Sequence, residues 1–175
     1  MELRFEEEIL IPKARIAILI GKKGAVRKTI ERKGKVKLKI SATGAVKISA
    51  KDAFYLLIAR NVVEAIGRGF NPKIAEKLFK EENSYELVNL QDFGARGKSD
   101  LRRLRGIIIG EAGRAKNIIQ QKTHTDIAVF GKTVAIIGLA EGVTMARQAI
   151  EMLLTGARHA TVYRVIEEKQ HGGRR

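Results

Sequence analysis

The sequence contains no cysteine and no tryptophan, and aromatic residues make up only 5% of it. Without cysteine, disulfides and thiolate metal sites are excluded, and an intracellular, cytoplasmic chain is the expectation. No apolar run approaches the ~20 residues that a membrane-spanning helix needs. The acidic start, MELRFEEEILIPK, resembles neither a secretory signal nor a transit peptide. A membrane location is therefore not expected.

Negative charge is also scarce. The chain carries 34 Lys and Arg residues against 19 Asp and Glu residues, a net charge of +15. Residues 1–80 hold 19 of the basic residues and 8 of the acids, and residues 21–39 hold nine basic residues with Glu31 as their one acid. This balance indicates a polyanionic partner, with nucleic acid as the first expectation, and it centres the electrostatic attraction on residues 21–39.

The chain repeats itself at a spacing of 89 residues. The segment ILIGKKGAVRKTI begins at Ile18, and IIIGEAGRAKNII begins at Ile107. The shift aligns Gly21 with Gly110 and Gly24 with Gly113, and it continues without a gap through the alternating segments that follow. Two copies of one structural unit are the simplest interpretation.

Periodicity predicts the same order of elements in each copy. A strand, two short helices around the glycines, a hairpin and a longer amphipathic helix give β-α-α-β-β-α, an α+β pattern. The predicted ranges are 5–11, 14–20, 25–33, 36–40, 46–48 and 51–66, then 85–90, 99–109, 114–122, 126–130, 134–137 and 141–154. The predicted domains are 1–72 and 83–175. The linker between them, residues 73–82, is expected to form a helix over residues 73–81, and one more helix is expected after Thr155 as a C-terminal extension.

The tetrapeptide Gly21-Lys22-Lys23-Gly24 stands where a helix begins. Glycine allows a sharp turn and a close approach of a ligand backbone, and a helix start presents backbone amides with partial positive charge. Two lysines add full charges, so the segment has the chemistry of a phosphate-binding loop. A single such tetrapeptide is more often a solvated turn. Its repetition, its apolar flanks and the hairpin behind it favour phosphate binding.

The run from Ile11-Pro12 through the glycine loop, Ile30 and the hairpin resembles the K-homology (KH) domain of archaeal and eukaryotic topology. That resemblance implies two KH domains, each a three-stranded antiparallel sheet packed by three helices, whose glycine loops clamp about four nucleotides. The second copy, LRRLRGIIIGEAGRAKNIIQQKTHTDIAVFGKTVAIIG with MARQAIEMLLTGA, is similar to the Partner-of-Nob family of small-subunit ribosome assembly factors. This similarity implies a monomer that binds single-stranded ribosomal RNA near its 3′ end, beside an endonuclease and a dimethyladenosine methyltransferase.

Candidate RNA-binding residues follow from the loops and their surroundings. Phosphate affinity is assigned to Lys22, Lys23, Arg27 and Lys28 of the first copy. Close backbone approach is assigned to Gly21 and Gly24, and in the second copy to Gly110 and Gly113; the whole second loop, Gly110 to Gly113, is a candidate for RNA binding. A groove beside the loops is expected from Ile16, Leu19, Ile20, Leu38 and Ile40, and from Ile107, Ile109, Ile127 and Val129. Shape, hydrogen bonds and phosphate contacts should dominate there, because paired aromatic residues for base stacking are lacking.

The second loop, Gly110-Glu111-Ala112-Gly113, departs from the KH pattern. Glu111 places a carboxylate where a basic or small residue is usual, which weakens phosphate binding. Neighbouring cations either compensate for it or form a solvated face, and the sequence favours neither. These cations are Arg102, Arg103, Arg105, Arg114 and Lys116.

No catalytic constellation is found. No nucleophile can be combined with a base and an orienting acid, and three separated histidines without cysteine do not suggest a metal site. Asp52 and Glu141 are interpreted as helix-start carboxylates. No enzyme activity, metal or cofactor is therefore expected. Two alternatives to the ribosomal assignment stay open: a general single-stranded RNA-binding KH protein acting on mRNA or in RNA decay, and a scaffold whose second domain binds protein.

Overall fold

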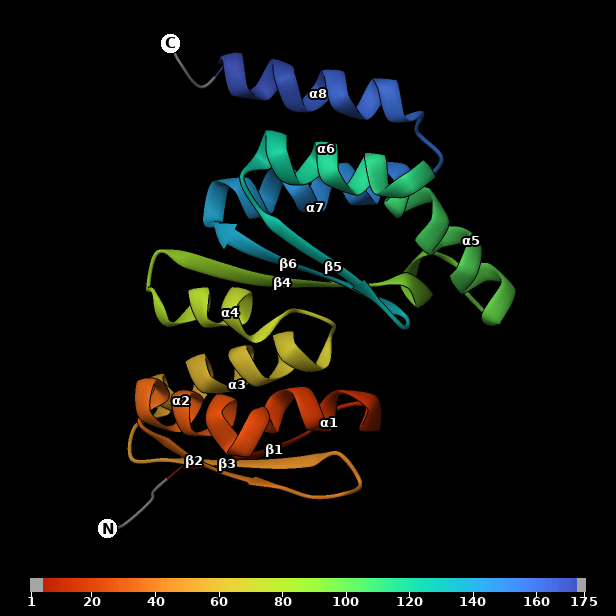
Figure 1. The fold of residues 1–175 in the computed structure, drawn as a ribbon. Coiled ribbons are helices and arrows are strands. Elements are labelled where there is room, and N and C mark those ends of the chain that lie inside the picture. Colours follow the sequence, from red (N-terminus) through yellow and green to blue (C-terminus); the bar gives the residue numbers. More distant parts are fainter. Residues whose placement is uncertain (1–4, 173–175) are drawn as a thin grey trace. The chain divides into compact units, whose positions relative to one another are not determined.

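The computed structural model describes residues 5–172, which form two compact units divided between Asn83 and Ser84. In the first unit, the elements are β1 (Phe5–Leu10), α1 (Lys13–Ile20), α2 (Ala25–Gly34), β2 (Val36–Ile40), β3 (Ala45–Ala50) and α3 (Ala53–Gly67). The three strands make an antiparallel sheet in the order β1-β3-β2, and the helices cover one of its faces (Figure 1).

Alternation along β2 determines which face of this sheet is buried. Val36 and Leu38 point into the core, 4% and 1% exposed, whereas Lys37 and Lys39 are exposed on the other face. Leu38 lies opposite Ile48 of β3, which is also fully buried. The period-two pattern in the sequence therefore predicted both the strand and its inward face.

Two side chains fix the ends of α3. The Asp52 carboxylate accepts a hydrogen bond from the Phe54 backbone N–H at 2.7 Å, which confirms its predicted role at the helix start. At the other end, the Arg15 guanidinium donates to the carbonyls of Ile66 at 2.8 Å and Phe70 at 2.7 Å. Burial lowers the pKa of Arg15 from its ordinary value. No pattern in the sequence predicts this second contact, which joins α1 to the end of α3.

The segment after α3 differs from the single helix predicted over residues 73–81. It forms a short helix, α4 (Pro72–Ala75), and a 3-10 turn, η2 (Glu76–Phe79), and the backbone is extended at Lys80. Ala75 and Leu78 are buried, and a spacing of three brings both to one side in the tighter 3-10 turn. This packing, together with contacts to α3, ends the helix early and keeps the segment with the first unit.

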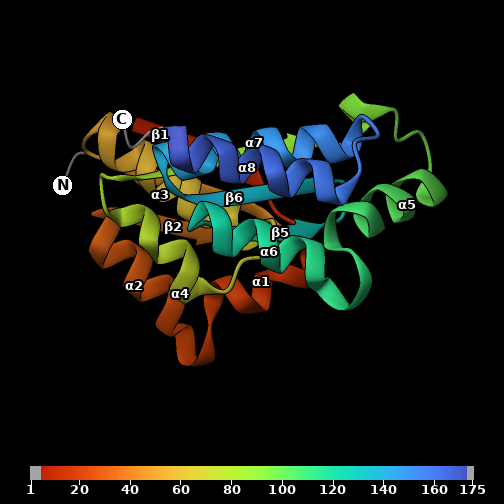
Figure 2. The ribbon, with the colours of Figure 1, turned by 90° about the horizontal axis from the view of Figure 1, so that it is seen from above.

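The second unit repeats the arrangement. Its elements are β4 (Asn83–Asn89), a 3-10 turn η3 (Leu90–Phe93), α5 (Lys98–Ile109), α6 (Arg114–Thr123), β5 (Asp126–Phe130), β6 (Thr133–Leu139), α7 (Ala140–Leu154) and α8 (His159–Gly172). The strand order is β4-β6-β5. The extension predicted after Thr155 is α8, which packs on α6 and α7 and buries Val162 and Ile166 (Figure 2). Glu141 lies in the first turn of α7, as predicted.

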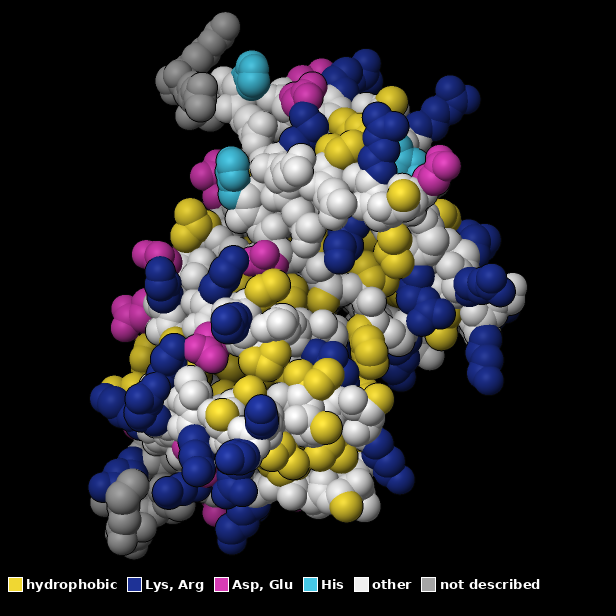
Figure 3. Space-filling model, viewed as in Figure 1, with side chains coloured by type: hydrophobic (Ala, Val, Ile, Leu, Met, Phe, Trp, Pro, Cys, Tyr) yellow, Lys and Arg dark blue, Asp and Glu magenta, His cyan; other side chains and the backbone are white. Residues whose placement is uncertain are grey.

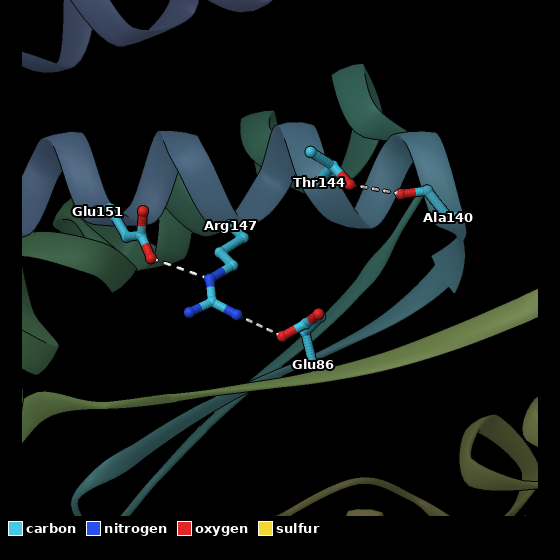
Figure 4. Close-up of polar contacts among 5 residues, drawn as sticks. All are labelled: Glu86, Ala140, Thr144, Arg147 and Glu151. Carbon is cyan, nitrogen blue, oxygen red and sulfur yellow. Dashed lines mark hydrogen bonds and ion pairs between the residues drawn. The ribbon is translucent and has the colours of Figure 1, made fainter.

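An arginine joins the first strand to the last long helix in each unit. Arg147 of α7 pairs with Glu86 of β4 and, at 2.9 Å, with Glu151 one turn further on (Figure 4). These contacts, first the hydrogen bond with Glu151, raise the pKa of Arg147 above its ordinary value. In the first unit Arg60 of α3 pairs with Glu7 of β1 at 2.7 Å. In each unit an acidic side chain of the first strand is thus paired with an arginine, of α3 in the first unit and of α7 in the second.

The predicted fold class is confirmed. Both units are α+β, with a three-stranded antiparallel sheet packed by three helices in the order β-α-α-β-β-α. Within residues 5–172, no helix combines the length and the apolar character needed to cross a lipid bilayer.

Candidate nucleic-acid interface

The two glycine loops have nearly the same backbone conformation. Gly21 and Gly110 have φ/ψ of 73°/171° and 72°/177°, and the closing glycines, Gly24 and Gly113, have 76°/16° and 77°/9°. Each closing glycine donates its N–H to the carbonyl of the opening one, at 3.1 Å and 3.2 Å. The repeat in the sequence is therefore a repeat of one tight turn between two helices.

The opening and closing glycines serve different purposes. A Cβ built on Gly21 would lie 2.5 Å from Val26 Cγ2, and one on Gly110 would lie 2.7 Å from Ala115 Cβ. Glycine is needed at both positions so that the helix after the loop can pack closely. A Cβ on Gly24 would meet nothing within 4 Å. The closing glycine of the first loop thus leaves open surface, over which another chain's backbone can approach.

The residue before each closing glycine also has positive φ. Lys23 has φ/ψ of 53°/28° and Ala112 has 50°/27°, a left-handed conformation that costs a non-glycine residue roughly 1–2 kcal/mol. No signal in the sequence identified this strain. Lys22 and Lys23 are both exposed.

The cations predicted near the first loop are brought together. Lys22 and Lys23 form the turn itself, and Arg27 and Lys28 lie in the first turn of α2, all with exposed side chains. Arg27 makes a 3.6 Å ion pair with Glu31. Lys and Arg side chains gather over α2 and β2 in Figure 3. This surface of the first unit therefore presents a continuous positive field to a polyanion.

The predicted groove is only partly exposed. Leu19, Leu38 and Ile127 are at most 3% exposed, so this part of the prediction is wrong: they belong to the cores. The others are half-buried or exposed and can still line a groove; they are Ile16, Ile20, Ile40, Ile107, Ile109 and Val129. Of these, Ile107 is partly covered by α8, because His159 hydrogen bonds to its carbonyl at 2.8 Å.

A side chain of the second helix contacts the edge strand in each unit. Glu31 Oε1 accepts from the Leu38 N–H at 2.9 Å, and Gln120 Oε1 accepts from the Ile127 N–H at 2.7 Å. Both pairs are related by the 89-residue shift. These contacts hold α2 on β2 and α6 on β5, and so fix the position of each glycine loop relative to its sheet. No pattern in the sequence predicts these two hydrogen bonds.

The second loop is less basic. Glu111 is exposed at the position equivalent to Lys22, and Ala112 replaces Lys23. Arg114 is exposed directly after the loop and Lys116 is partly buried, so both remain near it. Arg102 and Arg103 are exposed on α5, about 10 Å or more along the helix from Gly110 at 1.5 Å per residue.

Arg105 is directed elsewhere. Its guanidinium donates to the Gly131 carbonyl, in the turn between β5 and β6, at 3.2 Å. Among the described residues, no group of three His, Asp or Glu side chains is arranged to hold a metal ion. The structure therefore leaves the first loop as the stronger candidate for phosphate contacts.

Comparison with known families assigns both units. Residues 84–171 match the second KH domain of PNO1-type proteins, described as a eukaryotic type KH-domain (KH-domain type I), and residues 6–56 match the KH domain. The chain belongs to the Pno1-type family of tandem KH proteins. The resemblance noted in the sequence to the Partner-of-Nob family is confirmed.

Three relatives illustrate the range of this Pno1-type family. A KH domain-containing protein of Methanocaldococcus jannaschii is 44% identical over 168 residues, which are 94% of this chain and 74% of the relative. The pre-rRNA-processing protein PNO1 of Chaetomium thermophilum is 32% identical over 110 residues, 62% of this chain and 42% of that protein. A chain in the crystal structure of the a/eIF2α–aDim2p–rRNA complex from Pyrococcus horikoshii OT3 is 43% identical, with a TM-score of 0.89, over 96% of this chain and 95% of that one.

Proposed function

We propose that this protein binds single-stranded small-subunit ribosomal RNA, near its 3′ end, as a non-catalytic factor of ribosome assembly and rRNA processing in the cytoplasm. The observation that carries the proposal is the first glycine loop, where two exposed lysines and an unobstructed closing glycine stand at the start of a helix. The family membership and the rRNA-containing complex of a 43% identical relative support ribosomal RNA as the ligand.

The roles of individual residues follow from the geometry. Lys22, Lys23, Arg27 and Lys28 contact phosphates, and Gly24 lets the strand approach the backbone. Phosphate oxygens accept hydrogen bonds from ammonium and guanidinium groups, and the helix start adds a favourable field. Neither contact needs a particular base, so sequence preference arises from the half-buried groove residues such as Ile40. The protein acts as a holder of RNA for processing enzymes, the endonuclease and the dimethyladenosine methyltransferase, and works as a monomer.

The second loop contributes less to RNA affinity in this proposal. Gly110, Ala112 and Gly113 keep the geometry of a binding loop, whereas Glu111 opposes a phosphate. Arg114 and Lys116 offset this charge, and Arg102 and Arg103 extend the contact along α5. A protein-binding role for the second unit is the second candidate, favoured by the acidic loop.

The test is a fluorescence-anisotropy titration with RNA from the small-subunit 3′ end and a scrambled strand of the same composition. Replacing both loop lysines, Lys22→Asp with Lys23→Asp, is expected to weaken binding and reduce the log-log salt slope by roughly 0.7 for each lost phosphate contact. Aspartate tolerates the positive φ at position 23, so the fold should be retained.

The matched control is Lys73→Asp with Lys80→Asp, which changes the net charge equally at exposed positions outside the loop. A loop variant that has the slope of this control would refute the loop assignment. Equal affinity for the native and scrambled strands would refute the 3′-end assignment and leave a general RNA-binding protein.

A further inference from the structure

A cavity of about 540 Å³ opens in the first unit between α2, the start of β2 and the start of α3. Five cationic side chains line it together with Tyr55: Lys28, Arg32, Lys35, Lys37 and Lys51. Among these, only Lys28 belongs to the binding site proposed above. The cavity therefore adds four positive charges whose purpose the glycine loop does not explain.

Both acids in the wall of the cavity already have partners. Asp52 accepts the Phe54 N–H at 2.7 Å, and Glu31 accepts the Leu38 N–H at 2.9 Å and pairs with Arg27. These two carboxylates offset part of the charge, and five cations against two acids leave the lining with a net charge of +3. None of the five cations forms an ion pair with an acid in residues 5–172.

The remaining polar groups are donors. Lys35 Nζ donates to the Tyr55 hydroxyl at 2.6 Å and lies 4.4 Å from the centre of its ring. Because the hydroxyl oxygen accepts this bond, its proton is left to donate to a further acceptor. Most of the lining surface is apolar, but its ammonium, guanidinium and hydroxyl donors suit an anion with several acceptor oxygens, and phosphate is such an anion.

The second unit shows that folding does not require these charges. A hollow of about 430 Å³ lies there beside His124 and Glu141, which the 89-residue shift aligns with Lys35 and Asp52, and α8 adds Gln170 and His171 to its lining. No Lys or Arg is among the described residues that line it. The 89-residue shift replaces the five cations with Asn117, Gln121, His124, Asp126 and Ala140. Each unit thus has a hollow near the start of its third helix, and Lys and Arg line it in the first unit only.

The cavity also lies on the course that α2 sets from the glycine loop. Lys28 and Arg32 are four residues apart and share one side of the helix, and Lys35 follows directly after the last residue of α2. Lys35 is 11 residues past Gly24, which is about 16 Å along the helix at 1.5 Å per residue. A strand held at the loop and leaving along this side reaches the cavity after the roughly four nucleotides that a KH loop clamps.

We propose that this cavity is a second phosphate-binding site, which holds backbone phosphates of the RNA strand where it continues past the glycine loop. The inference rests on the proposed function, in that the first unit binds single-stranded RNA. It makes the footprint of the first unit longer than that of the second.

The test uses a double variant of the full chain that carries both Arg32→Gln and Lys51→Gln. Its RNA binding is compared with that of the unaltered protein. Binding of a ten-nucleotide strand from the small-subunit 3′ end is expected to lose roughly 1.4 from the log-log salt slope, which is two phosphate contacts at about 0.7 each. Binding of a four-nucleotide strand should not change, because it ends before the cavity.

The matched control is Lys73→Gln with Lys80→Gln, which removes the same charge. These residues flank η2, whose Glu76 pairs with Lys33 at 2.6 Å, and Lys33 points to a different side of α2 from the cavity. Equal slopes for the two double variants on the ten-nucleotide strand would overturn the proposal. A second result would also overturn the proposal. In it, a polyglutamate peptide binds the unaltered protein but not the cavity variant, while the two proteins have the same log-log salt slope for RNA binding.

Two further arms separate the sources of failure. The Lys22 and Lys23 double variant tests the glycine loop alone. If its salt slope is normal and the slope of the cavity variant is reduced, the assignment of phosphate contacts to the loop is refuted and their assignment to the cavity is retained. NMR of the Arg32 side-chain N–H then distinguishes a strand from a free nucleotide. The ten-nucleotide strand is expected to shift this signal at concentrations where AMP does not, and an equal shift by AMP would overturn the assignment to a strand.

Discussion

Replacing each glycine of the first loop by alanine, which adds one methyl group, should distinguish an effect on stability from an effect on RNA binding. Gly21 has a φ/ψ combination that only glycine adopts readily, and a Cβ there would lie 2.5 Å from Val26 Cγ2. We expect Gly21→Ala to cost about 2–5 kcal/mol, from backbone strain and overpacking less the entropy that alanine removes from the unfolded chain.

Gly24→Ala should behave differently. Its left-handed conformation costs an alanine roughly 1–2 kcal/mol, the unfolded-state effect offsets part of this, and the new methyl meets no protein atom within 4 Å. A net loss of about 1 kcal/mol leaves the fold intact. The methyl nevertheless occupies the surface over which the strand approaches, and losing one charge-assisted hydrogen bond there, about 1.5–3 kcal/mol, weakens affinity tenfold or more.

Amide hydrogen exchange measures each unit separately, which one unfolding transition of a two-domain chain does not. Protection in β3 should fall with Gly21→Ala by roughly 30-fold or more, since 2 kcal/mol represents about 30-fold, whereas β6 stays unchanged. The matched control for the binding effect is Gly94→Ala, whose φ/ψ of 89°/11° and open surroundings resemble those of Gly24. Equal exchange rates in β3 of the Gly21 and Gly24 variants would refute the predicted difference in stability. An equal loss of RNA affinity in the Gly94 and Gly24 variants would refute the predicted role of Gly24 in binding.

Two further substitutions test the stability of each unit, one through a contact within the first and one through backbone strain in the second. Arg15→Lys should destabilise the first unit by about 2–3 kcal/mol, because one ammonium does not reproduce two guanidinium bonds to the carbonyls of Ile66 and Phe70, and an unchanged β3 exchange rate would contradict this. His124→Gly should stabilise the second unit by about 0.5–1 kcal/mol, since it relieves a positive φ of 54° at the end of α6, and slower exchange in β6 is the measurement.

Periodicity predicted the regular elements well, because each has one buried side. The alternation Val36-Lys37-Leu38-Lys39-Ile40 predicted β2 with its bounds, and glycine spacing located both loops. The short helix KARIAILI, by contrast, is apolar on most sides, so its pattern does not tell core from groove. Leu19 was therefore placed in the groove although it is fully buried.

The remaining features depend on residues far apart in the chain or on backbone strain. Arg15 reaches α3 across 51 residues, and the cavity forms only when residues 28–37 meet residues 51–55. A left-handed lysine at position 23 runs against its residue type, so no local pattern predicts it. The tertiary fold imposes these features, and a sequence pattern contains no signal for them.

The hydrogen bonds from Glu31 to Leu38 and from Gln120 to Ile127 have a consequence for self-association. Strands β2 and β5 lie at the edges of their sheets, and an unpaired edge N–H invites a strand from another molecule. In both units a helix side chain already accepts one backbone N–H of that edge strand. An incoming strand would have to displace it, so the contact that positions each glycine loop also discourages the sheets from joining edge to edge at high protein concentration.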